Sequence, residues 1–335
     1  MRKLILVTGG TGFIGRHLVQ ALVNAGKRIR CLVLPNSDIT VLKKMSVEIV
    51  YGDVLDLRSL QKAVEGVEIV YHLAAYVRPY RNFYQLHKFS DSFDDVNVLG
   101  TQNLADVCCE SHVQRFIFYS SIAVAGLGEG HTEASVCEPI TTYGQSKLKA
   151  EKYLMALYES KNFPVVILRP GQVFGPANMP MLTLFRFVRR GVLPSFGPGT
   201  NRIPFCFVDN LIHATLSAES KGSIGTQYYI FDEHLTLRGF SLLIAEALGV
   251  QLSRFYIPKY LAVLGITLKE LIEKVIRVRI CPLRMDISSE TIKIATNNWT
   301  FSNEKSIKEL EYQSQISLKE GVEKTVQWYR ERGYL

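Results

Sequence analysis

The chain of 335 residues has few cysteines and no long apolar run. Its six cysteines show no CxxC spacing and no paired framework, which favours reduced thiols over disulfides and argues against a metal site. No stretch approaches the roughly 18 apolar residues that a membrane span needs, and Met1-Arg2-Lys3 leads into an apolar run too short for a signal peptide. We therefore expect a cytoplasmic protein that holds no metal.

Positive charge is in excess, but it is spread along the chain. The formal net charge is +8, and the densest basic group consists of Arg186, Arg189 and Arg190. Because no long basic tract exists, we expect no nucleic-acid partner. A solvated basic face, a phosphate-bearing cofactor and an anionic membrane surface each remain open as explanations of the excess.

Short apolar runs alternate with stretches of helical periodicity. The expected strands are 4–7, 29–34, 47–51, 68–73, 116–120 and 165–168, and the expected helices are 13–23, 57–64 and 144–160. This alternation predicts an α/β fold with a Rossmann-type, doubly wound parallel sheet. Ligands of such a sheet bind at the carboxyl ends of its strands.

The pattern changes after Arg169-Pro170, where glycine, proline and aromatic residues become frequent. We expect a dinucleotide-binding domain over 1–175, to which the chain returns around 205–232. The segments 176–204 and 233–335 would form a smaller α+β substrate-binding portion. Within 255–282, leucines alternate with basic residues, so this segment is open to three interpretations: core packing, a cover over the substrate pocket, or peripheral contact with a membrane.

A glycine motif follows the first expected strand directly. Gly9, Gly12 and Gly15 read G-x-x-G-x-x-G, and Phe13 and Ile14 begin the next helix. Residues without a Cβ permit a tight turn and close approach of a pyrophosphate, and a helix N-terminus offers free N–H groups to an anion. The motif at this position predicts a dinucleotide cofactor.

Two further runs end neighbouring strands and fit the same cofactor. In Gly52-Asp53-Val54, the carboxylate of Asp53 is placed to accept a hydrogen bond from an adenine amino group, or to cap a helix. In His72-Leu73-Ala74-Ala75, the small residues Ala74 and Ala75, after Leu73, allow the backbone to run close beside the cofactor.

The second expected strand lacks the carboxylate that usually binds the adenosine ribose. It ends in Leu34-Pro35-Asn36-Ser37, and Asp38 comes several residues late. Nothing there repels a 2′-phosphate, which Asn36, Ser37 and Arg16 are placed to contact. We therefore favour NADP(H) over NAD(H), although no arginine stands at the strand end itself.

Tyr143 and Lys147 form a Tyr-x-x-x-Lys pair at the start of an expected helix. Residues at i and i+4 lie on one helical face, so we expect the lysine to lower the pKa of the phenol towards the range useful for acid–base catalysis. Ser120 and Ser121 end a buried strand upstream and suit hydrogen bonding to a substrate oxygen, or turn capping.

Taken together, these motifs resemble the extended short-chain dehydrogenases/reductases, and the resemblance covers nearly the whole chain. The matching residues, in family order, are the glycine motif, Asp53, His72–Ala75, Asn97 within Asp95–Thr101, the serines, Tyr143 with Lys147, Arg169–Pro176 and Val208-Asp209-Asn210.

The resemblance implies a role for each matching side chain. Ser121, five residues before Gly126, would orient the substrate oxygen, and Tyr143 would transfer the proton. Lys147 would hold the nicotinamide ribose and depress the Tyr143 pKa. Asn97 would support a water relay. The loop from Pro170 to Val173 would border the nicotinamide carboxamide.

Three features of the sequence bear on the substrate. Ile122-Ala123 follows Ser121 without the Asp-Glu pair of dehydratases, and Gln172 stands where sugar-nucleotide enzymes usually carry asparagine. Arg202, seven residues before Asp209, resembles the arginine that binds the pyrophosphate of sugar nucleotides. We favour an oxidoreductase acting on a bulky apolar alcohol or ketone. A nucleotide-sugar 4-epimerase or reductase, a non-catalytic NADP(H)-binding protein and a homodimeric assembly remain open.

Overall fold

The computed structural model describes residues 3–77, 93–193, 199–253, 293 and 296–335. Its largest sheet has seven strands in the order β10-β7-β5-β4-β1-β2-β3, and every neighbouring pair is parallel. These strands are β1 (Leu4–Thr8), β2 (Arg28–Val33), β3 (Glu48–Tyr51), β4 (Ile69–His72), β5 (Arg115–Tyr119), β7 (Val165–Pro170) and β10 (Thr226–Ile230). The chain reverses its direction of winding between β1 and β4, and a ligand crevice opens at such a point in doubly wound sheets.

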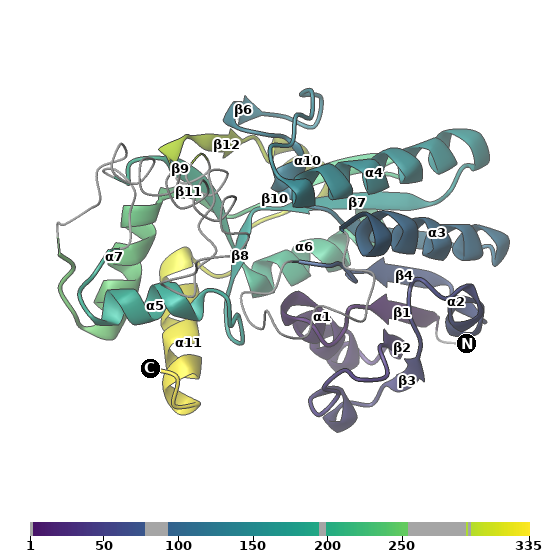
Figure 1. The fold of residues 1–335 in the computed structure, drawn as a ribbon, viewed down its shortest axis with the longest axis horizontal. Helices are drawn as coiled ribbons and strands as arrows, with labels where there is room; N and C mark the ends of the chain where they lie inside the picture. The colour runs from purple at the N-terminus through teal and green to yellow at the C-terminus, as the bar shows by residue number, and fades with distance from the viewer. Residues whose placement is uncertain (1–2, 78–92, 194–198, 254–292, 294–295) are drawn as a thin grey trace, which may run out of the picture.

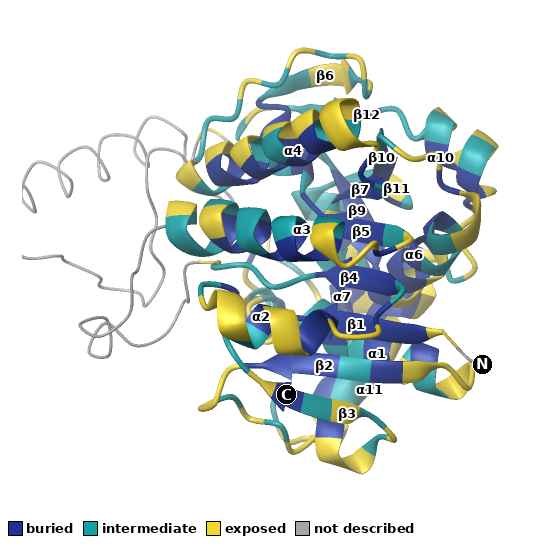
Figure 2. Cartoon of the chain, turned by 90° about the vertical axis from the view of Figure 1, so that its right-hand side faces the viewer, coloured by how far each residue is buried: buried dark blue, intermediate teal, exposed yellow. Residues whose placement is uncertain are grey.

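Helices cover both faces of this sheet (Figure 1). One face packs against α1 (Phe13–Asn24) and α6 (Val208–Lys221), and the other packs against α2 (Leu57–Val64), α3 (Gly100–Glu110) and α4 (Thr142–Lys161). Because both faces are covered, β1, β4 and β7 are buried along their whole length, as Figure 2 shows for β1 and β4. The predicted doubly wound parallel sheet is confirmed.

Two small sheets and further helices continue from the strand ends. The three-stranded sheet has the order β11-β9-β8, β12 pairs with β6, and α7 packs against α5 and α11. The elements are β6 (Gly128–His131), β8 (Gln172–Phe174), α5 (Leu182–Arg189), β9 (Arg202–Phe207), β11 (Glu233–Thr236), α7 (Leu237–Leu248), β12 (Trp299–Phe301), α10 (Glu304–Leu310) and α11 (Leu318–Glu331). Short turns η1 (Leu42–Lys44), η2 (Asp95–Leu99) and η3 (Ile122–Val124) complete the set.

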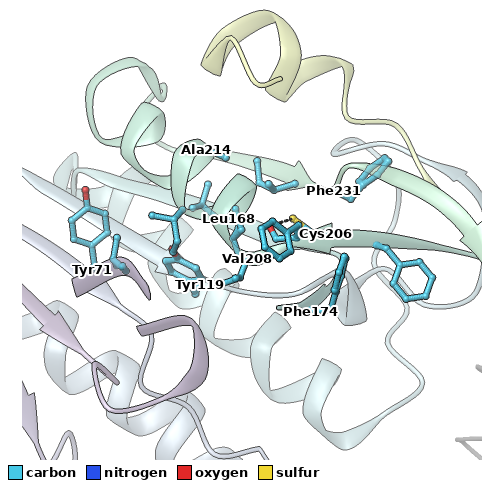
Figure 3. Packing of buried hydrophobic residues seen from close by; sticks show 14 of the residues in the cluster. Tyr71, Tyr119, Leu168, Phe174, Cys206, Val208, Ala214 and Phe231 are labelled. Carbon is cyan, nitrogen blue, oxygen red and sulfur yellow. Dashed lines mark hydrogen bonds between the residues drawn. The ribbon is translucent and has the colours of Figure 1, made fainter. Parts of the chain in front are cut away.

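One hydrophobic core joins the two parts of the molecule. Figure 3 shows Tyr119 and Leu168 of the large sheet in the same cluster as Phe174 of β8 and Cys206 of β9, which belong to the three-stranded sheet. Phe174 packs edge-on against Phe240 of α7 with 4.9 Å between ring centroids. The boundary that we predicted near residue 175 therefore crosses continuous packing, and the division into domains stays a prediction.

The described residues bear on several further expectations. Cys31, Cys108, Cys109, Cys137 and Cys206 are free thiols, and no group of three or more potential metal ligands occurs among the described residues. Within the same residues, no helix combines the length and the apolar character that crossing a membrane requires. The segment 255–282 lies outside the described residues, so its three interpretations stay open.

Candidate functional site

The glycine motif forms a tight turn between β1 and α1, and two of its glycines are sterically required. Gly9 has a φ of +72°, and a Cβ there would lie 2.7 Å from the Ala74 amide nitrogen. A Cβ at Gly15 would lie 2.1 Å from the Gly9 carbonyl oxygen. Because these contacts are with backbone atoms, any side chain would force the turn away from the strand ends.

Gly12 is different, because a Cβ there would meet only the Gly9 oxygen, at 3.2 Å. Gly12 is the N-cap of α1, and no side chain accepts a hydrogen bond from the first turn of this helix. The half-exposed residues Phe13 and Ile14 begin the helix. A cradle of free N–H groups beside open space fits the pyrophosphate of a dinucleotide.

The end of β2 offers no carboxylate to a ribose. Asn36 and Ser37 lie in an exposed turn, and Asp38 Oδ1 accepts a hydrogen bond of 2.9 Å from the Thr40 amide. Hydrogen bonding to Thr40 lowers the pKa of Asp38, and the positive charge of Arg16 lowers it further. The Arg16 guanidinium itself donates to the carbonyls of Thr11 and Gly12, at 2.9 and 3.3 Å.

Asp53 and Val54 form the turn that leads into α2. Asp53 Oδ1 accepts a hydrogen bond of 3.0 Å from the Leu55 amide, whereas the N-cap of α2 is Asp56. Val54 is buried and packs against Gly100 of α3, where a Cβ would lie 2.6 Å from the valine side chain. The adenine contact that we expect from Asp53 stays a prediction.

A buried hydrogen-bond chain positions the end of β4. His72 Nδ1 lies 2.7 Å from Thr8 Oγ1, and Nε2 lies 3.0 Å from Thr101 Oγ1. Thr101 donates to the Asn97 carbonyl, and Thr8 accepts from the Ala74 amide. These directions make His72 a neutral ring protonated at Nε2. Burial, and to a smaller extent the positive charge of Lys147, lower its pKa to about 3, so the ring stays neutral near pH 7.

This chain fixes the segment Leu73–Ala75 beside the glycine turn. All three residues are partly buried, and the Ala74 amide is the atom that a Cβ at Gly9 would strike. The backbone of this segment therefore lies directly against the glycine turn, and the expected approach of a cofactor beside Ala74 and Ala75 stays a prediction.

Tyr143 lies in the first turn of α4, close to Ser121. The N-cap Thr141 accepts a hydrogen bond of 2.9 Å from the Gly144 amide, and a Cβ at Gly144 would lie 2.3 Å from the Ala123 carbonyl. The start of α4 thus packs tightly on η3, whose N-cap is Ser121. The Ser121 hydroxyl, which accepts a hydrogen bond of 3.1 Å from the Ala123 amide, lies close enough to the Tyr143 phenol to offset part of the rise in pKa that burial causes there.

The pKa of Tyr143 shifts in the direction opposite to our expectation. Burial raises it to about 12, and the hydrogen bond from Ser121 offsets only part of this increase. Lys147 is not among the groups that shift it. Our expectation of a phenol activated by Lys147 was therefore wrong for the protein without its cofactor, because a buried phenolate loses more solvation than its neighbours restore.

Lys147 is 2% exposed and lies one turn further along α4. Its Nζ lies 4.4 Å from the centre of the Phe118 ring. Burial lowers the pKa of the ammonium to about 7, while the negative charge of Glu151 acts in the opposite direction. Glu151, one more turn along, forms a bidentate ion pair with Arg169 of β7, with distances of 3.0 and 2.6 Å.

Asn97 lies in η2, a single π-helical turn before α3. Its Oδ1 accepts from the Tyr76 amide at 2.6 Å, and its Nδ2 donates to the Tyr76 carbonyl and to Ser146 Oγ. The side chain therefore ties the segment after β4 to α4 and is fully engaged in doing so. A water relay at Asn97 stays a prediction.

The residues expected around the substrate make fewer contacts with one another than the residues around Tyr143 do. Pro170 ends β7, and Val173 in β8 accepts a hydrogen bond from Asn178 through its carbonyl. Gln172 is exposed, and its Nε2 lies 3.9 Å from Met181 Sδ. Arg202, at the exposed start of β9, donates to the His234 carbonyl at 3.3 Å. None of the described contacts of Arg202 involves Ser121, Tyr143 or Lys147.

The sequence analysis missed one group at this site, Glu151, and it left open which partner the Ser120 hydroxyl bonds. Glu151 follows Lys147 at i+4 on the same helix, a spacing that could have revealed it. Ser120 is 4% exposed, and its Oγ has no hydrogen-bond partner among the described residues. It lies one residue beyond β5, on the same side of the sheet as Phe118 by strand alternation. A buried hydroxyl without a partner at the carboxyl end of β5 fits a cofactor that supplies the partner.

Comparison with known proteins identifies a matching family and relatives of two kinds. The model of the "NAD dependent epimerase/dehydratase family" matches residues 5–230. The chain is 30% identical to sterol demethylase protein B of Methylococcus capsulatus, over 98% of this chain and 99% of that protein. It is 28% identical to human dTDP-D-glucose 4,6-dehydratase, over 98% of this chain and 90% of that protein. The crystal structure of gox2253 matches at 25% identity with a TM-score of 0.84, and the match covers both chains entirely.

Proposed function

The chain belongs to the NAD dependent epimerase/dehydratase family and is an enzyme of the extended short-chain dehydrogenase type, and on this basis we propose its reaction. It transfers a hydride between a nicotinamide cofactor and a secondary alcohol or ketone. The substrate is bulky and apolar, of the sterol, isoprenoid or flavonoid kind.

The residues after Ser121 support this proposal most directly. Ile122 is 5% exposed, and Ala123 follows it in η3. Loss of a hydroxyl as water needs a nearby acid that protonates the leaving oxygen. Neither side chain supplies one, so redox chemistry at a carbon that bears oxygen suits the site better than dehydration.

The relatives divide between two substrate classes. One is named a sterol demethylase protein and aligns with nearly the full length of the chain, and the other is named a dTDP-D-glucose dehydratase. The absence of a dehydratase acid next to Ser121 favours the first class. The exposed Gln172, in place of the asparagine expected in sugar-nucleotide enzymes, favours it as well.

Two side chains carry the proposed proton transfer. Ser121 orients the substrate oxygen through its hydroxyl, which lies close enough to the Tyr143 phenol to offset part of the rise in pKa that burial causes there. Tyr143, with its pKa raised to about 12, is protonated at neutral pH and donates a proton to the oxygen of a ketone being reduced. In the reverse direction the phenolate accepts the proton of the alcohol. When bound, the nicotinamide supplies the hydride chemistry.

Several residues would hold that cofactor. Gly9, Gly12 and Gly15 would border the pyrophosphate, Lys147 the ribose of the nicotinamide, and the loop from Pro170 to Val173 its carboxamide. At the other end, we propose a preference for NADP(H). The supporting observation is that β2 ends without a carboxylate: Asn36 is exposed and Ser37 partly exposed, while the carboxylate of Asp38 is engaged by the Thr40 amide.

Arg202 supports one alternative, a nucleotide-sugar 4-epimerase. An exposed arginine suits the pyrophosphate of such a substrate. However, its guanidinium donates to the His234 carbonyl, and its backbone amide donates to Asn298 Oδ1. These contacts give it a structural role at the start of β9, so we keep the epimerase as the second candidate. A non-catalytic NADP(H)-binding protein is the third, and the retained Tyr143 and Lys147 argue against it.

Turnover tests distinguish these candidates. The purified protein is incubated with NADP⁺ or NAD⁺ and a panel of sterol, isoprenoid and nucleotide-sugar alcohols, and reduced cofactor is followed at 340 nm. The nucleotide sugars are also separated by chromatography after the incubation, because a 4-epimerase returns the hydride to its substrate and leaves no net reduced cofactor. We expect activity in the apolar part of the panel. Activity only with nucleotide sugars would overturn the substrate proposal, and cofactor binding without turnover of any alcohol would favour the non-catalytic protein.

A further inference from the structure

Helix α5 is strongly two-sided. Leu182, Phe185 and Val188 are buried at a spacing of three residues, and Arg186 and Arg189 are exposed. Figure 1 shows α5 at the edge of the molecule beside α11. The Phe185 ring packs edge-on against Tyr329 of α11, with 5.2 Å between centroids. The helix is therefore anchored by its apolar side, and its arginines face outwards.

Arg186, Arg189 and Arg190 line a hollow of about 280 Å³. No carboxylate in the described part of the chain forms an ion pair with any of them, whereas Arg30 pairs with Glu48 and Arg169 with Glu151. Arg186 Nε donates to the Tyr334 carbonyl, which leaves its charge uncompensated. The negative end of the α5 dipole favours positive charge in the last turn of the helix, which explains Arg186 and Arg189. Arg190 follows the last residue of the helix.

Exposed apolar side chains stand on both sides of α5 in the chain. Met179, before the helix, is 40% exposed, and Val192, after it, is 42% exposed. Cationic residues combined with exposed apolar residues are the composition with which peripheral proteins bind anionic lipid.

We propose that the arginine face of α5 docks the protein on an anionic membrane surface. The occupant follows from charge, because three guanidinium groups that have no ion-pair partner among the described residues attract anions. It also follows from the apolar flanks, which a small anion would leave exposed. The inference goes beyond the proposed function and is tested by binding alone. It is compatible with an apolar substrate, which partitions into the same membrane.

The test is co-sedimentation with vesicles of phosphatidylcholine, with and without about a third of phosphatidylserine. The variant R189Q/R190Q removes two charges and leaves the Arg186 contact with Tyr334 intact. Each basic residue near such a surface contributes roughly fivefold to binding, so we expect about a 25-fold loss of affinity for the anionic vesicles. Binding should also fall steeply as salt rises.

The matched control is K43Q/K44Q, which removes two exposed charges next to β3 and should leave binding nearly unchanged. If both variants lose the same affinity for anionic vesicles, binding depends on the net charge of the protein and not on the arginine face of α5, and the proposal is overturned. The proposal is also overturned if the wild-type protein binds vesicles of pure phosphatidylcholine as tightly as vesicles that contain phosphatidylserine. Competition by millimolar inorganic phosphate at constant ionic strength would identify a small-anion site instead, and the docking proposal would be wrong.

Discussion

Replacing Lys147 with methionine should abolish activity and yet stabilise the folded protein at neutral pH. Lys147 is 2% exposed, and burial lowers its pKa from 10.5 to about 7 despite the nearby charge of Glu151. A lysine kept at such a position for chemistry has a cost in stability, which a methionine of similar length avoids.

The size and sign of the effect follow from the two pKa values. The folded state has the lower pKa, so the unfolded chain binds more protons between pH 7 and 10.5, and this group makes stability rise with pH across that window. At ~1.4 kcal/mol per pH unit, Lys147 lowers the free energy of unfolding by about 5 kcal/mol well below pH 7 and by about 4 kcal/mol at pH 7. This effect falls to about 2 kcal/mol at pH 9 and vanishes above pH 10.5.

Urea denaturation of the wild type and of K147M at pH 7 and pH 9 measures this directly. The stability gained by the variant should be about 2 kcal/mol larger at pH 7 than at pH 9. Differences in packing between lysine and methionine cancel in this comparison, because they do not depend on pH. The control is K149M, which removes an exposed lysine that pairs with Asp94 on the same helix. A gain that is the same at both pH values would refute the argument.

Three further predictions concern the ligands. Gly12→Val should fold normally, since a Cβ there meets only one atom, at 3.2 Å, yet lose cofactor binding by calorimetry, whereas Gly15→Ala should lose stability through its 2.1 Å contact with Gly9. Undiminished cofactor affinity in Gly12→Val would show that the motif is misinterpreted. NADPH should bind more tightly than NADH, and the reverse order would indicate that Asp38 reaches back to the ribose. Arg202→Ala should change thermal stabilisation by UDP by no more than about 0.5 kcal/mol, whereas strong stabilisation that the variant loses would favour the epimerase.

The sequence was sufficient to predict six of the seven strands of the central sheet, because each of the six is a short apolar run between helical stretches, whereas β10 (Thr226–Ile230) was not predicted. The strand expected at 4–7 is β1 (Leu4–Thr8), and the helix expected at 144–160 is α4 (Thr142–Lys161). Strands buried on both faces require apolar residues at every position, so their pattern is visible without any knowledge of the fold. The glycine motif was equally visible, because its spacing directly reflects backbone contacts.

The interactions that support the site were not predictable in this way. The buried pair of Glu151 and Arg169 joins a helix to a strand, and the hydrogen bonds of His72 join residues far apart in sequence. The direction of the Tyr143 pKa depends on burial, which the Tyr-x-x-x-Lys spacing does not reveal. Arg202 matched a family position, and its contacts with His234 and Asn298 became apparent only in three dimensions.

Tyr143→Phe, assayed with an alcohol substrate found in the turnover panel, tests the central claim most directly. The substitution removes only the phenolic oxygen, so the fold and the affinity for the cofactor should be retained. Turnover followed at 340 nm should fall by about 10²- to 10⁴-fold, the usual contribution of general acid–base catalysis. A loss below about tenfold, with cofactor affinity unchanged, would contradict the assignment of Tyr143 as the group that transfers the proton.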